Sequence, residues 1–182
     1  MLWRHQSNGT IAVWGMSNFA PSGQPIGTLP ISWQVAGSGD FNGDGTSDIL
    51  WRNQVNGANY IWGMNNFVPN GRPLGALPTS WQVGDIGDFN GDGTSDILWR
   101  NQVNGANYIW GMNNFAPAGH PLGTLPISWQ VGSAADFNGD GTTDIVWRNR
   151  GNGNNAIWQM TNFAPSNRPL PPRPDLFWEI QR

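Results

Sequence analysis

DFNGDGTSDILWRNQVNGANYIWGMNNF occupies residues 88–115, and residues 40–67 repeat the same letters without a change. The lag of 48 residues extends along the whole chain, since a Trp-Arg pair recurs at Trp3-Arg4, Trp51-Arg52, Trp99-Arg100 and Trp147-Arg148. A fixed period of this length is typical of repeat architectures. The sequence therefore predicts a single repeat domain over residues 1–182, with four units at about 1–35, 36–83, 84–131 and 132–182.

Each unit contains three segments with strand character and a fourth, weaker one. In the third unit these segments lie at 81–89, 96–101, 106–112 and about 118–125. Residues 96–101 alternate, which places Ile97 and Trp99 on one face of a strand. The weak segment contains Pro121, and proline is confined to edge strands or loops. Three or four antiparallel strands in a repeat of this length predict an all-β fold, a β-propeller with four blades.

The composition excludes several classes of protein. There are 12 Trp, 25 Gly and 14 Pro residues, which disfavours both disorder and a helical bundle. The absence of cysteine excludes disulfides and thiol chemistry. No apolar run is long enough to cross a bilayer, and the first residues do not read as a signal peptide. The nine arginines form no cluster, so we expect neither membrane insertion nor nucleic-acid binding.

The two ends of the chain are in register with each other. The chain starts within a second-strand pattern at residues 2–4 and ends just after a first-strand pattern at residues 178–181. We therefore expect the C-terminal strand to complete the blade that the N-terminus begins, which would close the ring and hide two sheet edges. Two alternatives stay open: an eight-bladed ring pooled from two chains, which makes the protein a homodimer rather than a monomer, and a fragment of a longer array.

Nine of the twelve acidic residues lie in three loops with the pattern D-x-N-x-D-G-x-[ST]-D. Alternating oxygen side chains on a tight turn converge on one point, and hard oxygen donors in this number suit Ca²⁺. The alternative, turns in which Asp and Asn only bond to the backbone, leaves the clustered carboxylates repelling one another. The pattern predicts three Ca²⁺ sites, with the seventh position contributing its carbonyl. Their ligands are Asp40, Asn42, Asp44, Thr46 and Asp48; Asp88, Asn90, Asp92, Thr94 and Asp96; and Asp136, Asn138, Asp140, Thr142 and Asp144.

No pattern indicates a catalytic site. His5 and His120 stand at non-equivalent positions of the repeat, and only Asp85, Asp175 and Glu179 are acidic outside the loops. These residues are poor material for a pair of catalytic carboxylates. We expect that the protein is not an enzyme.

Three tryptophans and an arginine in each unit allow two interpretations. Large aromatic residues at fixed repeat positions are most often core. An indole face can also stack on a sugar ring while arginine bonds its hydroxyl groups. The candidate ligand-binding residues are Trp33, Trp81, Trp129, Arg52, Arg100 and Arg148, although the arginines can equally pair with a carbonyl or a loop carboxylate.

The stretch DFNGDGTSDILWRN, followed by a strand that contains Trp, resembles the FG-GAP/VCBS repeats of bacterial secreted and surface proteins. It is also similar to the calcium-bearing blades of integrin α-subunit propellers. This resemblance implies a β-propeller with Ca²⁺ in its blade loops and an extracellular or cell-surface location. It covers adhesion modules, lectins and accessory domains of enzymes, so it does not fix one function. Two functions follow as expectations: a calcium-stabilised module that binds a glycan or a surface protein, and a structural scaffold, natural or engineered, without a small ligand.

Overall fold

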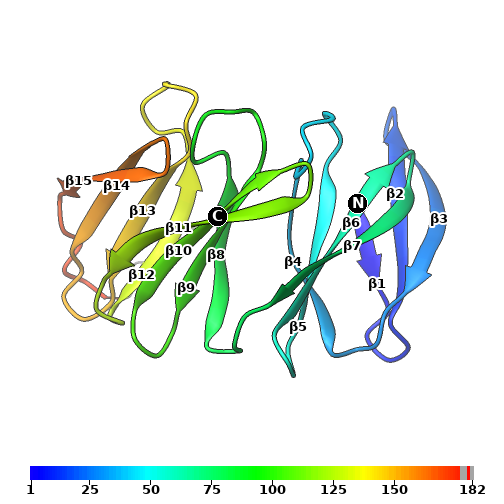
Figure 1. Cartoon of the computed structure of the whole chain (residues 1–182), viewed down its shortest axis with the longest axis horizontal. Coiled ribbons are helices and arrows are strands. Elements are labelled where there is room, and N and C mark those ends of the chain that lie inside the picture. Colours follow the sequence, from blue (N-terminus) through cyan, green and yellow to red (C-terminus); the bar gives the residue numbers. More distant parts are fainter. Residues whose placement is uncertain (177–179, 181–182) are drawn as a thin grey trace.

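The computed structural model of the chain describes residues 1–176 and 180, and over these residues it is all-β (Figure 1). The strands form four antiparallel sheets that follow one another along the chain. We call them sheets A to D. This arrangement confirms the predicted fold class, because it is consistent with a four-bladed β-propeller.

The four sheets repeat one pattern in which consecutive strands are neighbours. Sheet A has three strands: β1 (Leu2–Arg4), β2 (Thr10–Ser17) and β3 (Ala20–Thr28). Sheet B contains β4 (Trp33–Gly39), β5 (Asp48–Asn53), β6 (Ala58–Asn65) and β7 (Val68–Ala76). Sheet C contains β8 (Trp81–Gly87), β9 (Asp96–Asn101), β10 (Ala106–Asn113) and β11 (Ala116–Thr124). Sheet D contains β12 (Trp129–Ala135), β13 (Asp144–Asn149), β14 (Asn155–Thr161) and β15 (Ala164–Leu170).

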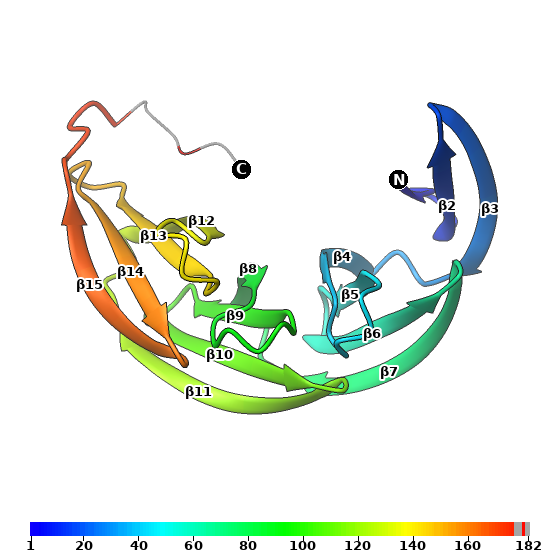
Figure 2. The same cartoon turned by 90° about the horizontal axis from the view of Figure 1, so that it is seen from above.

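Seen from above, the sheets fan out into an arc (Figure 2). The first strands of sheets B, C and D line the inner side of the arc, and the last strands form its outer rim. The strand that carries Pro121, β11, is the outermost strand of its sheet, as expected for a proline-containing edge strand.

A glycine is required at the turn that joins the two central strands of each full sheet. In sheet C this residue is Gly105, with a φ of +74° that few other residues adopt. Its amide donates to the carbonyl of Asn101, and a Cβ there would collide with the carbonyl of Leu125. The turn therefore fixes the register of the hairpin and also holds the connection to the next sheet.

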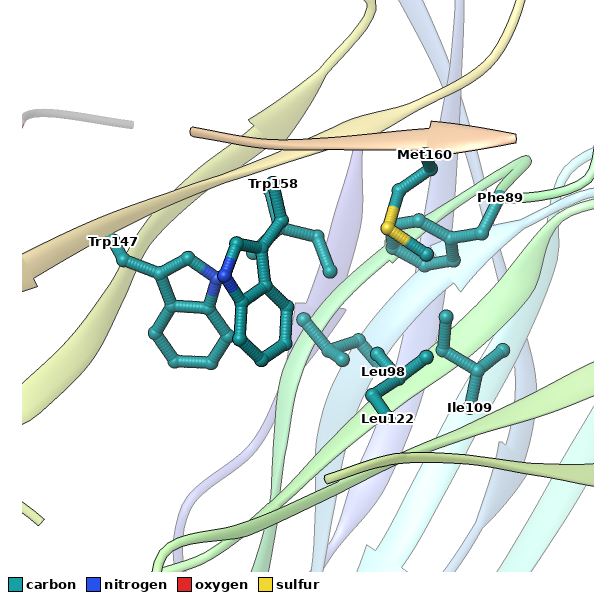
Figure 3. Packing of buried hydrophobic residues seen from close by; sticks show 8 residues of the cluster. Phe89, Leu98, Ile109, Leu122, Trp147, Trp158 and Met160 are labelled. Carbon is teal, nitrogen blue, oxygen red and sulfur yellow. The ribbon is translucent and has the colours of Figure 1, made fainter. Parts of the chain in front are cut away.

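The core lies between neighbouring sheets, and sheets B and C each bury both of their faces. Leu98 and Ile109 of sheet C pack against Trp147 and Trp158 of sheet D (Figure 3). The opposite face of sheet C, which carries Trp99, packs against sheet B. The predicted alternation along residues 96–101 is thus confirmed, with each face buried in a different interface.

The predicted ring closure concerns the end of the chain. Of the closing strand predicted at residues 178–181, residues 178, 179 and 181 lie outside the described residues. Within the part of the chain that the structure describes, β1 pairs with β2 alone and the four sheets leave the arc open between sheet A and sheet D (Figure 2). Closure by the terminal strands therefore stays a prediction.

Candidate functional site

The acidic loops connect the first and second strands of sheets B, C and D, and the middle copy represents all three. In it, the carboxylate of Asp88 accepts hydrogen bonds from the backbone amides of the tight turn that follows. Its Oδ1 is 2.7 Å from the amide nitrogen of Gly91, and its Oδ2 is 2.7 Å from that of Gly93. The first aspartate therefore shapes the loop.

The third and fifth positions of the loop are joined directly. The side-chain amide of Asn90 donates to Oδ2 of Asp92 at 2.7 Å, and the amide nitrogen of Thr94 donates to Oδ1 of Asp92 at 2.8 Å. In the first loop the corresponding bond from Asn42 holds the pKa of the Asp44 carboxyl below its usual value. The exposed carboxylate of Asp44 is therefore ionised at neutral pH, and in both loops oxygen atoms gather at the tip.

The ninth position of the loop, Asp96, is buried and does not belong to the exposed tip. Asp96 begins β9 and is fully buried, with Oδ2 accepting from the amide of Phe89 at 2.9 Å and Oδ1 accepting from the amide of Met112 at 2.8 Å. Burial raises the pKa of its carboxyl to about 7. In the structure this predicted ligand ties the loop to β10, underneath the exposed oxygen atoms.

The same bonds recur in the other two loops. Asp48 accepts from the amides of Phe41 and Met64, and Asp144 accepts from those of Phe137 and Met160. Within residues 1–176 and 180, no three His, Cys, Asp or Glu side chains lie close enough to hold a metal ion by themselves. A cation at these loops therefore depends on the asparagine and on backbone carbonyls as well as on carboxylates, a mixture of oxygen donors that Ca²⁺ accepts.

The loops also connect neighbouring sheets. The carbonyl of Asp88 accepts from the amide of Thr143 at 2.6 Å, and the carbonyl of Phe89 accepts from the amide of Phe163 at 3.1 Å. The Phe89 side chain is fully buried in the core between sheets C and D. The conformations of the first two loops are therefore coupled to the packing of the next sheet.

Sequence reasoning missed the phenylalanine that receives this contact. Phe163 is the second residue of a two-residue hairpin turn, with a φ of +65° that is uncommon for a bulky side chain. Its ring packs where a Cβ on Gly111 of sheet C would stand, and it also stacks on His120 at 3.9 Å. The repeated NF pair before the last strand was the available signal, because it recurs once in each unit.

The candidate arginines donate hydrogen bonds to the protein from both terminal guanidinium nitrogens. Arg100 is 1% exposed and donates to the carbonyls of Gly105 and Pro126 and to Oδ1 of Asn107. Its guanidinium lies 5.1 Å from the ring centroid of Trp147 in the next sheet. Arg52 and Arg148 donate to the carbonyls of the equivalent turns, which is the pairing that the sequence offered as the alternative to ligand binding.

The tryptophans divide into two groups. Trp51, Trp99 and Trp147 are fully buried, and the indole N–H of each has no hydrogen-bond partner among the described residues. The second group, Trp33, Trp81 and Trp129, is only partly buried at the start of each inner strand. Members of this group therefore have indole surface that a ligand can reach.

One member of the second group borders a cavity. Trp129 lines a space of about 590 Å³ on sheet D, together with Trp147 and Trp158 of the same sheet and Leu125 of the connection from sheet C. Exposed amide side chains, Asn154 and Asn167, lie at the same cavity. The structure thus brings one predicted ligand-binding residue together with polar groups that the sequence did not single out.

The fold and the loops define a class of protein, a repeat protein with propeller-type blades. The FG-GAP-like repeat matches residues 40–99 and again residues 88–147, more than half of the chain. The protein therefore belongs to the FG-GAP-like repeat family, as the resemblance implied. No curated protein matches the chain. The family is typical of non-catalytic interaction modules.

The described residues contain no helix that is long and apolar enough to cross a membrane.

Proposed function

We propose that this protein is a calcium-stabilised module that binds carbohydrate and has no catalytic activity. The cavity on sheet D carries the proposal, because an aromatic wall and several hydrogen-bonding groups meet there. Its volume of about 590 Å³ is within the range of pockets that bind small ligands.

The aromatic wall suits the apolar face of a sugar ring. Trp147 and Trp158 contact each other with ring centroids 4.9 Å apart, and Trp129 adds a partly exposed indole at the same cavity. Rigid aromatic side chains provide a large contact area. A pyranose presents C–H groups to such a surface and keeps its hydroxyl groups at the edge.

The polar groups suit the hydroxyl groups of a sugar. Asn154 and Asn167 each carry both a donor and an acceptor in the side-chain amide, and sugar hydroxyls need both. Trp147 lines the same cavity, and its buried indole N–H has no hydrogen-bond partner among the described residues. A buried donor without a partner is costly, so a hydroxyl oxygen or a water there is favourable. We place the ligand contacts on these residues rather than on the buried arginines.

Calcium in this proposal is structural. Asp88, Asn90 and Asp92 offer oxygen atoms at the exposed tip of the loop, and the carbonyl of Thr94 completes the proposed set. Each oxygen of Asp96 already accepts one amide and keeps a further lone pair. Since the same loop bonds to the next sheet, a bound cation would stabilise the packing between sheets as well as the loop. We propose three such sites in each chain and an extracellular or cell-surface location, where Ca²⁺ is abundant.

A structural or protein-interaction scaffold without a small ligand is the second candidate function. The full burial of Trp51 and Trp99 between sheets, and the use of the arginines to hold turns, favour it. The two candidates differ in whether the cavity takes a sugar.

The test is a titration of the whole protein with free sugars in Ca²⁺ buffer, followed by calorimetry and intrinsic tryptophan fluorescence. The panel is glucose, galactose, mannose, fucose and N-acetylglucosamine. We expect saturable binding of at least one sugar, lost in Trp129→Ala and kept in the matched control Val55→Ala, whose side chain is exposed in a turn of sheet B. Absence of binding to these sugars and to a glycan array would favour the scaffold.

A further inference from the structure

We propose that two copies of this chain associate head to tail. Sheet A of each copy packs on sheet D of the other, and the two open arcs together form a ring of eight sheets. The inference rests on the two end faces of the arc, which are the outer face of sheet A and the outer face of sheet D. The molecule already contains three interfaces between faces of these two kinds, namely those between sheets A and B, B and C, and C and D.

The outer face of sheet A is apolar and exposed. Trp3 is 49% exposed, Met16 is 46% exposed and Phe19 is 96% exposed. The residues at the same repeat positions in the other sheets are buried to a much greater degree: Trp51, Trp99 and Trp147 at 0%, and Met64, Met112 and Met160 at 7% or less. In sheets B to D this face packs on the preceding sheet, so sheet A presents a packing face that no described residue of the chain covers in the same way.

The outer face of sheet D is the complementary half. Phe137 is 49% exposed, whereas Phe41 and Phe89 at the equivalent positions are fully buried in the interface with the following sheet. Val146 and Leu170 stand where Leu98 and Leu122 of sheet C pack on sheet D. Sheet D therefore offers the same apolar pattern that sheet C offers to it.

The arginine row supports the same pairing. Arg4, Arg52 and Arg100 each lie over the tryptophan of the next sheet, at 5.3, 5.0 and 5.1 Å from a ring centroid. Arg148 continues the row in sheet D and lies over no aromatic ring among the described residues. In the proposed dimer, Trp3 of the second copy supplies this ring.

The inner edge of sheet A would be covered by the same association. Within the described part of the chain, β1 has no strand on its inner side, and a cavity of about 680 Å³ lies between Leu2 and Val35. Ile180 lies against Gly132, much as Val131 lies against Gly84, so it continues the row of inner strands beyond sheet D. In a two-copy ring, Ile180 of one copy comes next to the free edge of β1 in the second copy.

The shape of the arc selects a second copy as the occupant. Both end faces border the open side in Figure 2, so one further arc can contact both of them. A head-to-tail interface forms a closed ring when its rotation closes, and an open filament when it does not. Within the new interface one position departs from the repeat, since Gln159 stands where Gly15, Gly63 and Gly111 accept the ring of a phenylalanine. Phe19 must therefore seat beside Gln159 rather than over a glycine.

The test is the solution mass, measured by sedimentation velocity and light scattering over a wide range of protein concentrations in Ca²⁺ buffer. We expect twice the chain mass of 19.9 kDa. Phe19→Asp and, separately, Met16→Glu should shift the protein to the mass of one chain with an unchanged circular dichroism spectrum, because both side chains are exposed in the single arc. The matched control Val103→Asp, an exposed turn residue of the internal sheet C, should keep the double mass.

Three results would overturn the proposal. The first is a mass of one chain at every concentration, and the second is a mass that grows without limit as the concentration rises, as in a filament. The third is a Phe19→Asp and a Met16→Glu variant that are both folded and both have the mass of two chains.

Discussion

Asp96→Asn tests the assignment of the ninth loop position most sharply. The carboxylate of Asp96 accepts the amides of Phe89 and Met112 with one oxygen each, and the side chain is fully buried. Asparagine has the same shape, but it replaces one acceptor oxygen with an NH₂ group. One backbone amide then faces a donor instead of an acceptor.

The change in the free energy of unfolding combines the loss of a hydrogen bond with a smaller desolvation cost. Leaving a buried amide without an acceptor costs about 1–3 kcal/mol, and a hydrogen bond to a charged group is worth about 1.5–3 kcal/mol. Burial raises the pKa of the Asp96 carboxyl to about 7, so the neutral amide avoids part of the desolvation cost of the carboxylate. We expect a net loss of about 2 kcal/mol in the free energy of unfolding. For a protein of this size that corresponds to a fall of about 4–8 °C in melting temperature.

The assay is thermal unfolding in chelator, followed by tryptophan fluorescence and near-ultraviolet circular dichroism. The matched control is Asp92→Asn in the same loop, whose exposed side chain makes its bonds within the loop, so we expect a change within about 0.5 kcal/mol. In Ca²⁺ buffer both variants should lose stability relative to the parent. An Asp96→Asn protein that melts in chelator at the temperature of the parent would refute the structural role of Asp96.

Three further predictions concern the loops and the arginine. Burial raises the pKa of the Asp96 carboxyl to about 7, so the folded state binds more protons than the unfolded chain between about pH 3.9 and about pH 7. The contribution of these protons to the free energy of unfolding is fully present below about pH 3.9 and is lost as the pH rises to about 7. The melting temperature in chelator should therefore fall from about pH 5 to about pH 7.5, and less so in Asp96→Asn; an increase in both proteins would contradict this. Arg100→Lys should lower the free energy of unfolding by about 2–3 kcal/mol in chemical denaturation, because lysine cannot bond Gly105, Asn107 and Pro126 at once. An unchanged denaturation midpoint would show that these three bonds do not stabilise the fold. Asp92→Ala should reduce the calorimetric count of Ca²⁺ sites by one, and an unchanged count would remove Asp92 from the ligands.

The repeat made most of the fold predictable from the sequence. Because the same letters recur every 48 residues, a strand identified once is identified in every unit, and the alternation of Ile97 with Leu98 fixes which face each side chain takes. The weak fourth segment, predicted as an edge strand or a loop, is an edge strand, and the proline constraint that excluded a central strand is local.

The role of Asp96 was not predictable in the same way. The spacing of the loop places five oxygen-bearing residues near one another, but it does not reveal that the amides of Phe89 and Met112 compete for the last carboxylate. Met112 is 16 residues away along the chain, and its contact depends on the pairing of β9 with β10. Only the register of β9 against β10 brings the amide of Met112 to the carboxylate of Asp96.

The curvature of the arc also lies beyond local sequence signals. The angle between neighbouring sheets depends on how side chains such as Trp147 and Phe163 fill the space between them. A small change in each interface accumulates over four sheets. For this reason the sequence predicted blades but left open the number of blades in a closed ring.

The measurement that tests the central claim most directly is calcium binding to the intact protein, followed by calorimetry and by melting temperature on the same sample. We expect three Ca²⁺ sites in each chain and a clear rise in melting temperature from chelator to millimolar Ca²⁺. Binding to the folded state alone contributes about 2.7 kcal/mol for each site at a Ca²⁺ concentration of about 100 times Kd. A protein that binds no Ca²⁺ and melts at the same temperature in chelator would contradict the account.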